Sequence, residues 1–167
     1  MVEVEALRAE MQLERDPWPT TRAGAEVEVR AAASEEEIMA ASALFDHPVR
    51  AAWAERFLAE RNHHLLFAYA DNSPVGMVSG MEITHPDKGT EMLLHELGVD
   101  EEHRRRGVGT VLVRELLRTA RERGCGGMWV PLETGNEPAL RTYRSAGGAR
   151  ESDVAMVVWT ISAPGSR

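Results

Sequence analysis

Cysteine and lysine are almost absent from this chain, which has one of each, Cys125 and Lys88, among its 167 residues. A single cysteine excludes an internal disulfide, and no group of histidines and cysteines has the spacing of metal ligands, so we expect no bound metal. The 43% of apolar residues is enough for one domain to close a core without such crosslinks. These features predict a reducing, cytoplasmic setting.

Long apolar runs and a secretion signal are missing as well. No stretch reaches the ~18 apolar residues that a transmembrane helix needs. Residues 1–15 also lack the basic start and the continuous apolar run of a signal peptide. We therefore expect no membrane partner.

Positive charge is in deficit, and the formal net charge is −8. An acidic surface repels phosphate backbones, which argues against a nucleic-acid partner, and it attracts a small cationic amine. Solubility alone also accounts for such a charge.

The two ends of the chain differ in composition from its middle. Residues 1–25 mix charges with Pro17, Pro19 and Gly24 and have no sustained period, which is typical of an N-terminal extension. We expect a single domain over residues 26–161 and a polar tail over residues 162–167.

The periodicity of the middle region predicts strands and helices in a mixed order. The expected strands are 26–31, 64–70, 75–83, 91–99, 128–132 and 154–161, and the expected helices are 34–45, 49–61, 107–123 and 137–146. Ser34 followed by Glu37 has the spacing of a capping box at the first helix. This order predicts an α/β fold in which helices cover a sheet.

The strongest local signal is the segment Arg104–Thr110, which reads RRRGVGT between a strand and an amphipathic helix. Glycines let a ligand approach the backbone, and the first N–H groups of a helix have no internal partner, so this turn suits a pyrophosphate. Three arginines add bidentate donors for phosphate. A solvated basic turn with a glycine N-cap is the alternative. The segment lacks the third glycine of a dinucleotide site and the Lys-Ser/Thr pair of a nucleoside triphosphate loop.

Two motifs resemble those of the GNAT family of N-acetyltransferases. The first matches its coenzyme A turn at Arg104, Gly107 and Gly109, and the second matches a later helix at Asn136, Ala139, Tyr143 and Gly147. Thr142 and Gly148 depart from the second motif. The resemblance covers residues 26–161 and implies one domain with a mostly antiparallel sheet that splays after its fourth strand. It also implies that acetyl-CoA is bound.

By this resemblance, coenzyme A would be contacted from the splayed strand, the basic turn and the later helix. The implied residues are Leu97, Gly98, Val99, Arg104, Arg105, Arg106, Gly107, Val108, Gly109, Thr110, Asn136, Ala139 and Tyr143.

Acyl transfer to an amine needs a group that removes a proton and a group that returns one to the departing thiolate. Glu96 is the candidate base or amine-recognition group, because a carboxylate within an apolar strand is costly unless it is paired or functional. Strand alternation predicts that Leu94, Glu96 and Gly98 share one face. A structural pair between Glu96 and an arginine is the alternative. Tyr143 is the candidate acid by resemblance, and a tyrosine that only packs on the sheet is its alternative.

Three other polar residues have more ordinary interpretations. Glu133 is a candidate second carboxylate for a polycationic acceptor, or an exposed loop acid. His95 is expected to be a hydrogen-bonded core or rim histidine rather than a catalyst. Cys125 is expected to be a small apolar residue and not a nucleophile.

Within the family, the chain is most similar to the type I aminoglycoside 3-N-acetyltransferases. The similarity runs through Leu44–Phe45, His95–Val99, Glu102–Arg105 and Glu133–Ala139, and those enzymes have aspartates at the positions of Glu96 and Glu133. It implies acetylation of the 3-amino group of an aminoglycoside antibiotic, and thus antibiotic resistance. Gly98 and the different segment 48–61 depart from it. Another small amine, a peptide N-terminus and a non-catalytic acyl-CoA-binding module stay open, as does a homodimer.

Overall fold

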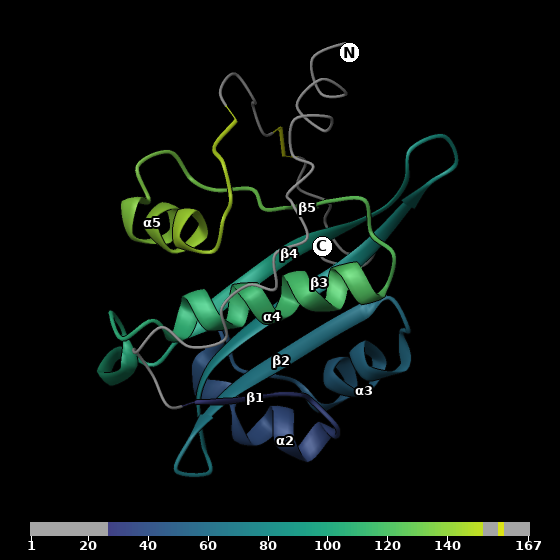
Figure 1. The fold of residues 1–167 in the computed structure, drawn as a ribbon. Coiled ribbons are helices and arrows are strands. Elements are labelled where there is room, and N and C mark those ends of the chain that lie inside the picture. Colours follow the sequence, from purple (N-terminus) through teal and green to yellow (C-terminus); the bar gives the residue numbers. More distant parts are fainter. Residues whose placement is uncertain (1–26, 152–156, 159–167) are drawn as a thin grey trace, which may run out of the picture.

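The computed structural model describes residues 27–151 and 157–158, which form a five-stranded sheet in the order β1-β2-β3-β4-β5 (Figure 1). The strands are β1 (Glu28–Ala31), β2 (His63–Ala70), β3 (Ser73–His85), β4 (Gly89–Val99) and β5 (Met128–Trp129). Neighbours from β1 to β4 are antiparallel, and β5 joins β4 in parallel. The mixed α/β class and the mostly antiparallel sheet are confirmed.

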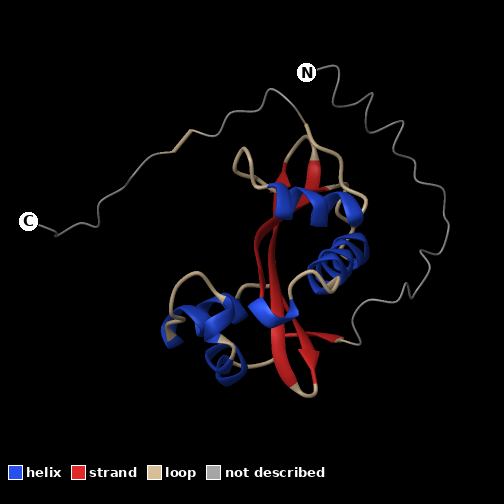
Figure 2. Ribbon diagram, turned by 90° about the vertical axis from the view of Figure 1, so that its left-hand side faces the viewer, coloured by secondary structure: helices blue, strands red, loops and turns tan. Residues whose placement is uncertain are grey.

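Helices cover both faces of this sheet, as the turned view shows (Figure 2). The helices are α2 (Glu35–Ala40), α3 (Ala51–Ala59), α4 (Val108–Glu122) and α5 (Glu137–Ser145), with short 3-10 turns η1 (Ser42–Leu44) and η2 (Glu101–His103). One buried cluster joins α4 to the sheet, and a second joins α2 and α3 to the opposite face. Helix α5 contacts α4.

Two glycines of β3 allow α4 to lie close to the sheet. A Cβ at Gly80 would stand 2.9 Å from Leu116 Cδ1, and one at Gly76 would stand 3.0 Å from Leu112 Cδ1. Both leucines are fully buried. This close packing fixes the first turn of α4 beside the end of β4, where the sequence places the basic turn.

The predicted side-chain cap of the first helix is confirmed, and a tight turn and a second cap define other elements. The Ser34 hydroxyl accepts a hydrogen bond from the Glu37 N–H at 3.3 Å and caps α2. Asp71 and Asn72, with φ of 49° and 63°, make the turn between β2 and β3. The Asn136 side chain accepts from the Ala139 N–H at 3.2 Å and caps α5.

Other boundaries differ from the prediction. The first helix ends at Ala40, and η1 follows it, instead of one helix over 34–45. The strand expected over 128–132 has only two residues, and Pro131 in that stretch has no N–H for a ladder.

The predicted terminal segments lie largely beyond the described residues. Residues 1–25, the tail 162–167 and most of the strand expected over 154–161 lie outside them, and the described Val157 and Val158 are exposed and in no strand. No helix in the described part of the chain is long and apolar enough to cross a membrane.

Candidate active site

A β-bulge at His95 sets the direction of the candidate base. Ser79 of β3 pairs with Glu96, but the next residue, Gly80, pairs with Leu94, so His95 is an extra residue in β4. The prediction that Leu94, Glu96 and Gly98 share one face is therefore wrong. Leu94 is 1% exposed in the cluster under α4, whereas Glu96 and Gly98 meet the segment after α2 on the opposite face. His95 itself is exposed, so of the expected core or rim position only the rim fits.

The segment from Leu44 to Asp46 lies directly against β4. The Asp46 N–H donates to Glu96 Oε1 at 3.1 Å, and a Cβ at Gly98 would stand only 2.3 Å from the Leu44 carbonyl oxygen. Among the described residues, Glu96 has no arginine within ion-pair distance. These contacts therefore do not support the alternative that Glu96 only forms a structural pair with an arginine. The Glu96 carboxylate is half-buried and held by a backbone donor.

Strands β4 and β5 separate next to this carboxylate. Only Met92 with Met128 and Leu93 with Trp129 are paired, while β4 continues to Val99. The edge of β4 from Leu94 to Val99 therefore has no β5 partner. This is the splay after the fourth strand that the fold prediction includes.

The basic turn opens α4 without a side-chain cap. Gly107 is the N-cap residue with φ of 87°, and no side chain of the described residues hydrogen-bonds to the first turn. A Cβ at Gly107 would meet no atom within 4 Å, so its left-handed φ, and not a lack of space, favours glycine here. The three arginines, Arg104 to Arg106, are exposed, and Arg104 Nε also donates to the Val99 carbonyl at 2.9 Å. Free N–H groups with exposed guanidinium groups form a donor set that fits a pyrophosphate.

Helix α5 brings Tyr143 to the same end of the sheet. A Cβ at Gly109 would stand 3.2 Å from Thr142 Cγ2 and 3.6 Å from Val99 Cγ2, so β4, α4 and α5 meet there. Tyr143 packs against the core cluster beneath α4. Burial raises the pKa of the Tyr143 phenol, which is therefore neutral at physiological pH and able to donate a proton.

The remaining candidates lie around this end. Asn136 and Ala139 form the first turn of α5 through the cap described above. Glu133 is exposed, and its carbonyl accepts from the Asn136 N–H at 3.1 Å. Cys125 is half-buried at the other end of α4, and burial raises the pKa of its thiol, which disfavours a reactive thiolate.

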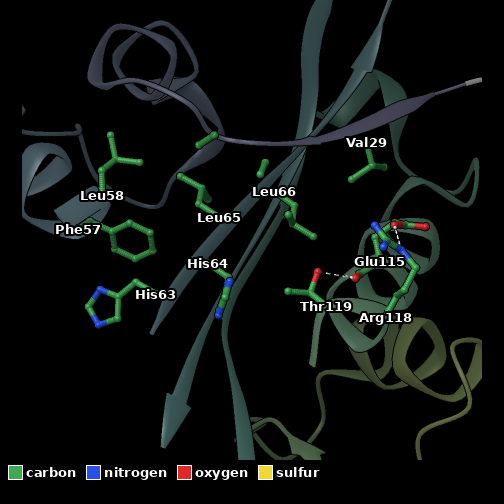
Figure 3. Close-up of a pocket in the computed structure, with 12 residues that line it drawn as sticks. Val29, Phe57, Leu58, His63, His64, Leu65, Leu66, Glu115, Arg118 and Thr119 are labelled. Carbon is green, nitrogen blue, oxygen red and sulfur yellow. Dashed lines mark hydrogen bonds and ion pairs between the residues drawn. The ribbon is translucent and has the colours of Figure 1, made fainter. Parts of the chain in front are cut away.

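A separate hollow of about 280 Å³ lies away from these residues. Figure 3 shows Phe57 and His63 on one side of it and Arg118 and Thr119 on the other, with His64 of β2 between them. Its α4 residues come from the second half of that helix, so it is not part of the candidate site.

Comparison with known proteins identifies the family. A model of the acetyltransferase (GNAT) family matches residues 27–147. The chain belongs to this family. It is 32% identical over 104 residues to human N-acetyltransferase 8, covering 62% of this chain and 46% of the relative. It is 36% identical over 107 residues to the N-alpha-acetyltransferase RimI of Mycobacterium tuberculosis, covering 63% and 64%. The chain thus spans less than two thirds of the curated relatives that it matches.

Solved GNAT structures share the fold at low identity. An aminoglycoside acetyltransferase from a soil metagenomic sample, in complex with sisomicin, has a TM-score of 0.73 at 18% identity, covering 81% of this chain and 97% of that one. The aminoglycoside N-acetyltransferase AAC(6')-Iy in complex with CoA has a TM-score of 0.70 at 18% identity, covering 85% and 100%.

Proposed function

We propose that this chain is an N-acetyltransferase that transfers acetyl from acetyl-CoA to a primary amine of a cationic small molecule. The observation that carries the proposal is the position of Glu96. Its carboxylate lies on the face opposite α4, held by the Asp46 N–H, where β4 has left β5. A base on that face and a phosphate-binding turn at the start of α4 give the two reactants separate approaches.

Acetyl-CoA supplies the activated acyl group as a thioester. The turn Arg104–Thr110 binds the pyrophosphate through backbone N–H groups of α4 and through exposed arginines. The unpaired edge of β4 at Leu97, Gly98 and Val99 offers backbone groups to the pantetheine arm. Asn136 and Ala139, at the start of α5, complete the cofactor side.

Glu96 accepts a proton from the ammonium form of the acceptor, directly or through one water, because only the neutral amine can attack. The Asp46 N–H keeps the Glu96 carboxylate in place while it does so. Tyr143, which burial keeps protonated, returns a proton to the departing sulfur. The amine nitrogen forms the new C–N bond as the C–S bond of the thioester breaks. Glu96 passes the first proton to solvent, and the second proton, which the nitrogen loses as the amide forms, replaces the one that Tyr143 gives to the sulfur.

The 3-amino group of an aminoglycoside is the proposed acceptor, and resistance the proposed role. Support comes from the similarity of His95–Val99 and Glu133–Ala139 to the type I enzymes, and from structural neighbours that are aminoglycoside acetyltransferases. Glu96 and the exposed Glu133 supply carboxylates for a polycation. A peptide N-terminus is the second candidate, favoured by the 36% identity to an N-alpha-acetyltransferase.

Release of free thiol from acetyl-CoA tests these candidates in one assay. The acceptors are gentamicin, kanamycin, spermidine, a peptide with a free N-terminus, and none. We expect turnover on the two aminoglycosides, with the product acetylated at the 3-amino group by NMR. If only the peptide is acetylated, the acceptor is a peptide N-terminus and not an aminoglycoside. Tight binding of acetyl-CoA with no turnover on any acceptor contradicts the proposal that the chain is an enzyme, and it favours a non-catalytic acyl-CoA-binding module.

A further inference from the structure

Trp129 is 46% exposed and lies on β5, the edge strand of the described sheet next to the candidate site. Trp53, the other large exposed aromatic residue of the described chain, has the Arg50 guanidinium 4.5 Å above its ring. Among the described residues, Trp129 makes no ring contact and no cation contact of this kind. The described part of the chain therefore leaves its aromatic face without a stacking partner.

The strand register places this indole on the same face as the Glu96 carboxylate. Residues paired across two parallel strands point to the same face of the sheet. The Trp129 side chain therefore shares a face with Leu93, and Met128 shares the other face with Met92. Met92 and Met128 belong to the cluster under α4, which puts Trp129 on the opposite face. The bulge at His95 turns Glu96 to that face too.

The two residues are also close along the sheet. Three residues of strand rise and one strand spacing separate Glu96 from Trp129, which puts their Cα atoms about 10 Å apart. Trp129 is the last paired residue of β5, so its side chain stands where the two strands begin to separate. An acceptor that places one amine at Glu96 has its neighbouring atoms within reach of the indole.

We propose that Trp129 is a specificity-determining residue that binds a ring of an amino-sugar acceptor against its indole face. An indole offers a rigid apolar surface for the C–H face of a sugar and a negative quadrupole for its ammonium groups. A rigid amino-sugar ring presents both at once and loses little conformational entropy, whereas a linear polyamine must be ordered first. This inference rests on the proposed function and narrows its substrate class to cyclic amines.

The test compares Trp129→Leu and Trp129→Phe with a control, Trp53→Ala, which removes an exposed tryptophan from α3. We expect Trp129→Leu to raise the KM for kanamycin by about 3- to 30-fold, the effect of one cation–π contact. The KM for acetyl-CoA stays unchanged, and the preference for kanamycin over spermidine falls. Trp129→Phe retains most of the affinity, and the control retains all of it.

Calorimetric titration of kanamycin into each variant, without acetyl-CoA, gives a readout that does not depend on turnover. A higher Kd for kanamycin in Trp129→Leu, at an unchanged melting temperature, supports the inference. An unchanged KM and Kd overturn it, and so does an equal rise in the KM for acetyl-CoA, which indicates a structural role. If the wild-type enzyme acetylates kanamycin and the Trp129 variants leave its KM and Kd unchanged, the proposed function holds and the inference about Trp129 fails. If the wild-type enzyme neither binds nor acetylates kanamycin, both fail.

Discussion

Replacing Gly98 by alanine tests how the acceptor side of the site is built. The new Cβ would stand 2.3 Å from the Leu44 carbonyl oxygen, a distance that real Cβ atoms essentially never show. The obstacle is backbone, so no rotamer change relieves it. The segment from Leu44 to Asp46 must therefore move away from β4, and the hydrogen bond from the Asp46 N–H to Glu96 is lost with it.

The expected magnitude follows from three terms, two that destabilise the variant and one that stabilises it. Overpacking of this kind costs about 1–3 kcal/mol, and a lost hydrogen bond to a carboxylate adds about 1 kcal/mol at a partly exposed site. Reduced entropy of the unfolded chain returns about 0.4–1 kcal/mol for a glycine-to-alanine change. The destabilising terms are larger, so we expect the free energy of unfolding to fall by about 1–3 kcal/mol. This corresponds to a melting temperature lower by about 2–10 °C in a domain of this size.

Thermal unfolding and steady-state kinetics read this variant out together. We expect a lower melting temperature and a rise in the KM for the amine that exceeds any rise in the KM for acetyl-CoA, because alanine keeps the Gly98 backbone groups proposed to contact pantetheine. Gly126→Ala is the matched control, because its Cβ would meet nothing nearer than the Thr90 carbonyl oxygen at 3.9 Å. Wild-type stability and acceptor KM in Gly98→Ala would refute the reasoning.

Three further changes address other parts of the molecule. Ser34→Ala removes the α2 cap and should lower the free energy of unfolding in urea by about 1 kcal/mol without altering kinetics; an altered kcat would contradict a purely local role. Burial and the Glu37 carboxylate raise the pKa of Tyr69 to about 12, above its unfolded value, so stability should fall as pH rises from 10 to 12, and less so in Tyr69→Phe; a flat profile opposes this. Arg104→Ala should weaken acetyl-CoA binding at low salt more than at high salt, as measured by calorimetry, and an unchanged Kd would remove it from the phosphate site.

Much of the fold follows from local signals in the sequence. The capping pair Ser34 and Glu37 marks the start of α2, and the turn residues Asp71 and Asn72 mark a hairpin, because each satisfies a backbone requirement within a few residues. Amphipathic spacing predicts α4 almost to its ends. These features depend on neighbours in the chain, so the sequence contains them.

The orientation of the candidate base does not follow from such signals. Strict alternation puts Glu96 on the face of Leu94, but the bulge at His95 reverses this, and the bulge arises from the pairing of β4 with β3. The exposure of Trp129 also depends on where β5 leaves β4 after two residues. Only the three-dimensional pairing therefore places Trp129 beside Glu96.

The central claim is that the Glu96 carboxylate is the base for an amine that approaches opposite α4. Comparison of wild type with Glu96→Gln, using kanamycin for kcat and calorimetry for the acetyl-CoA Kd, tests it most directly. We predict that kcat falls by about 10²-fold or more, in the range for removal of a general base, while the Kd stays the same. An unchanged kcat in Glu96→Gln would contradict the account.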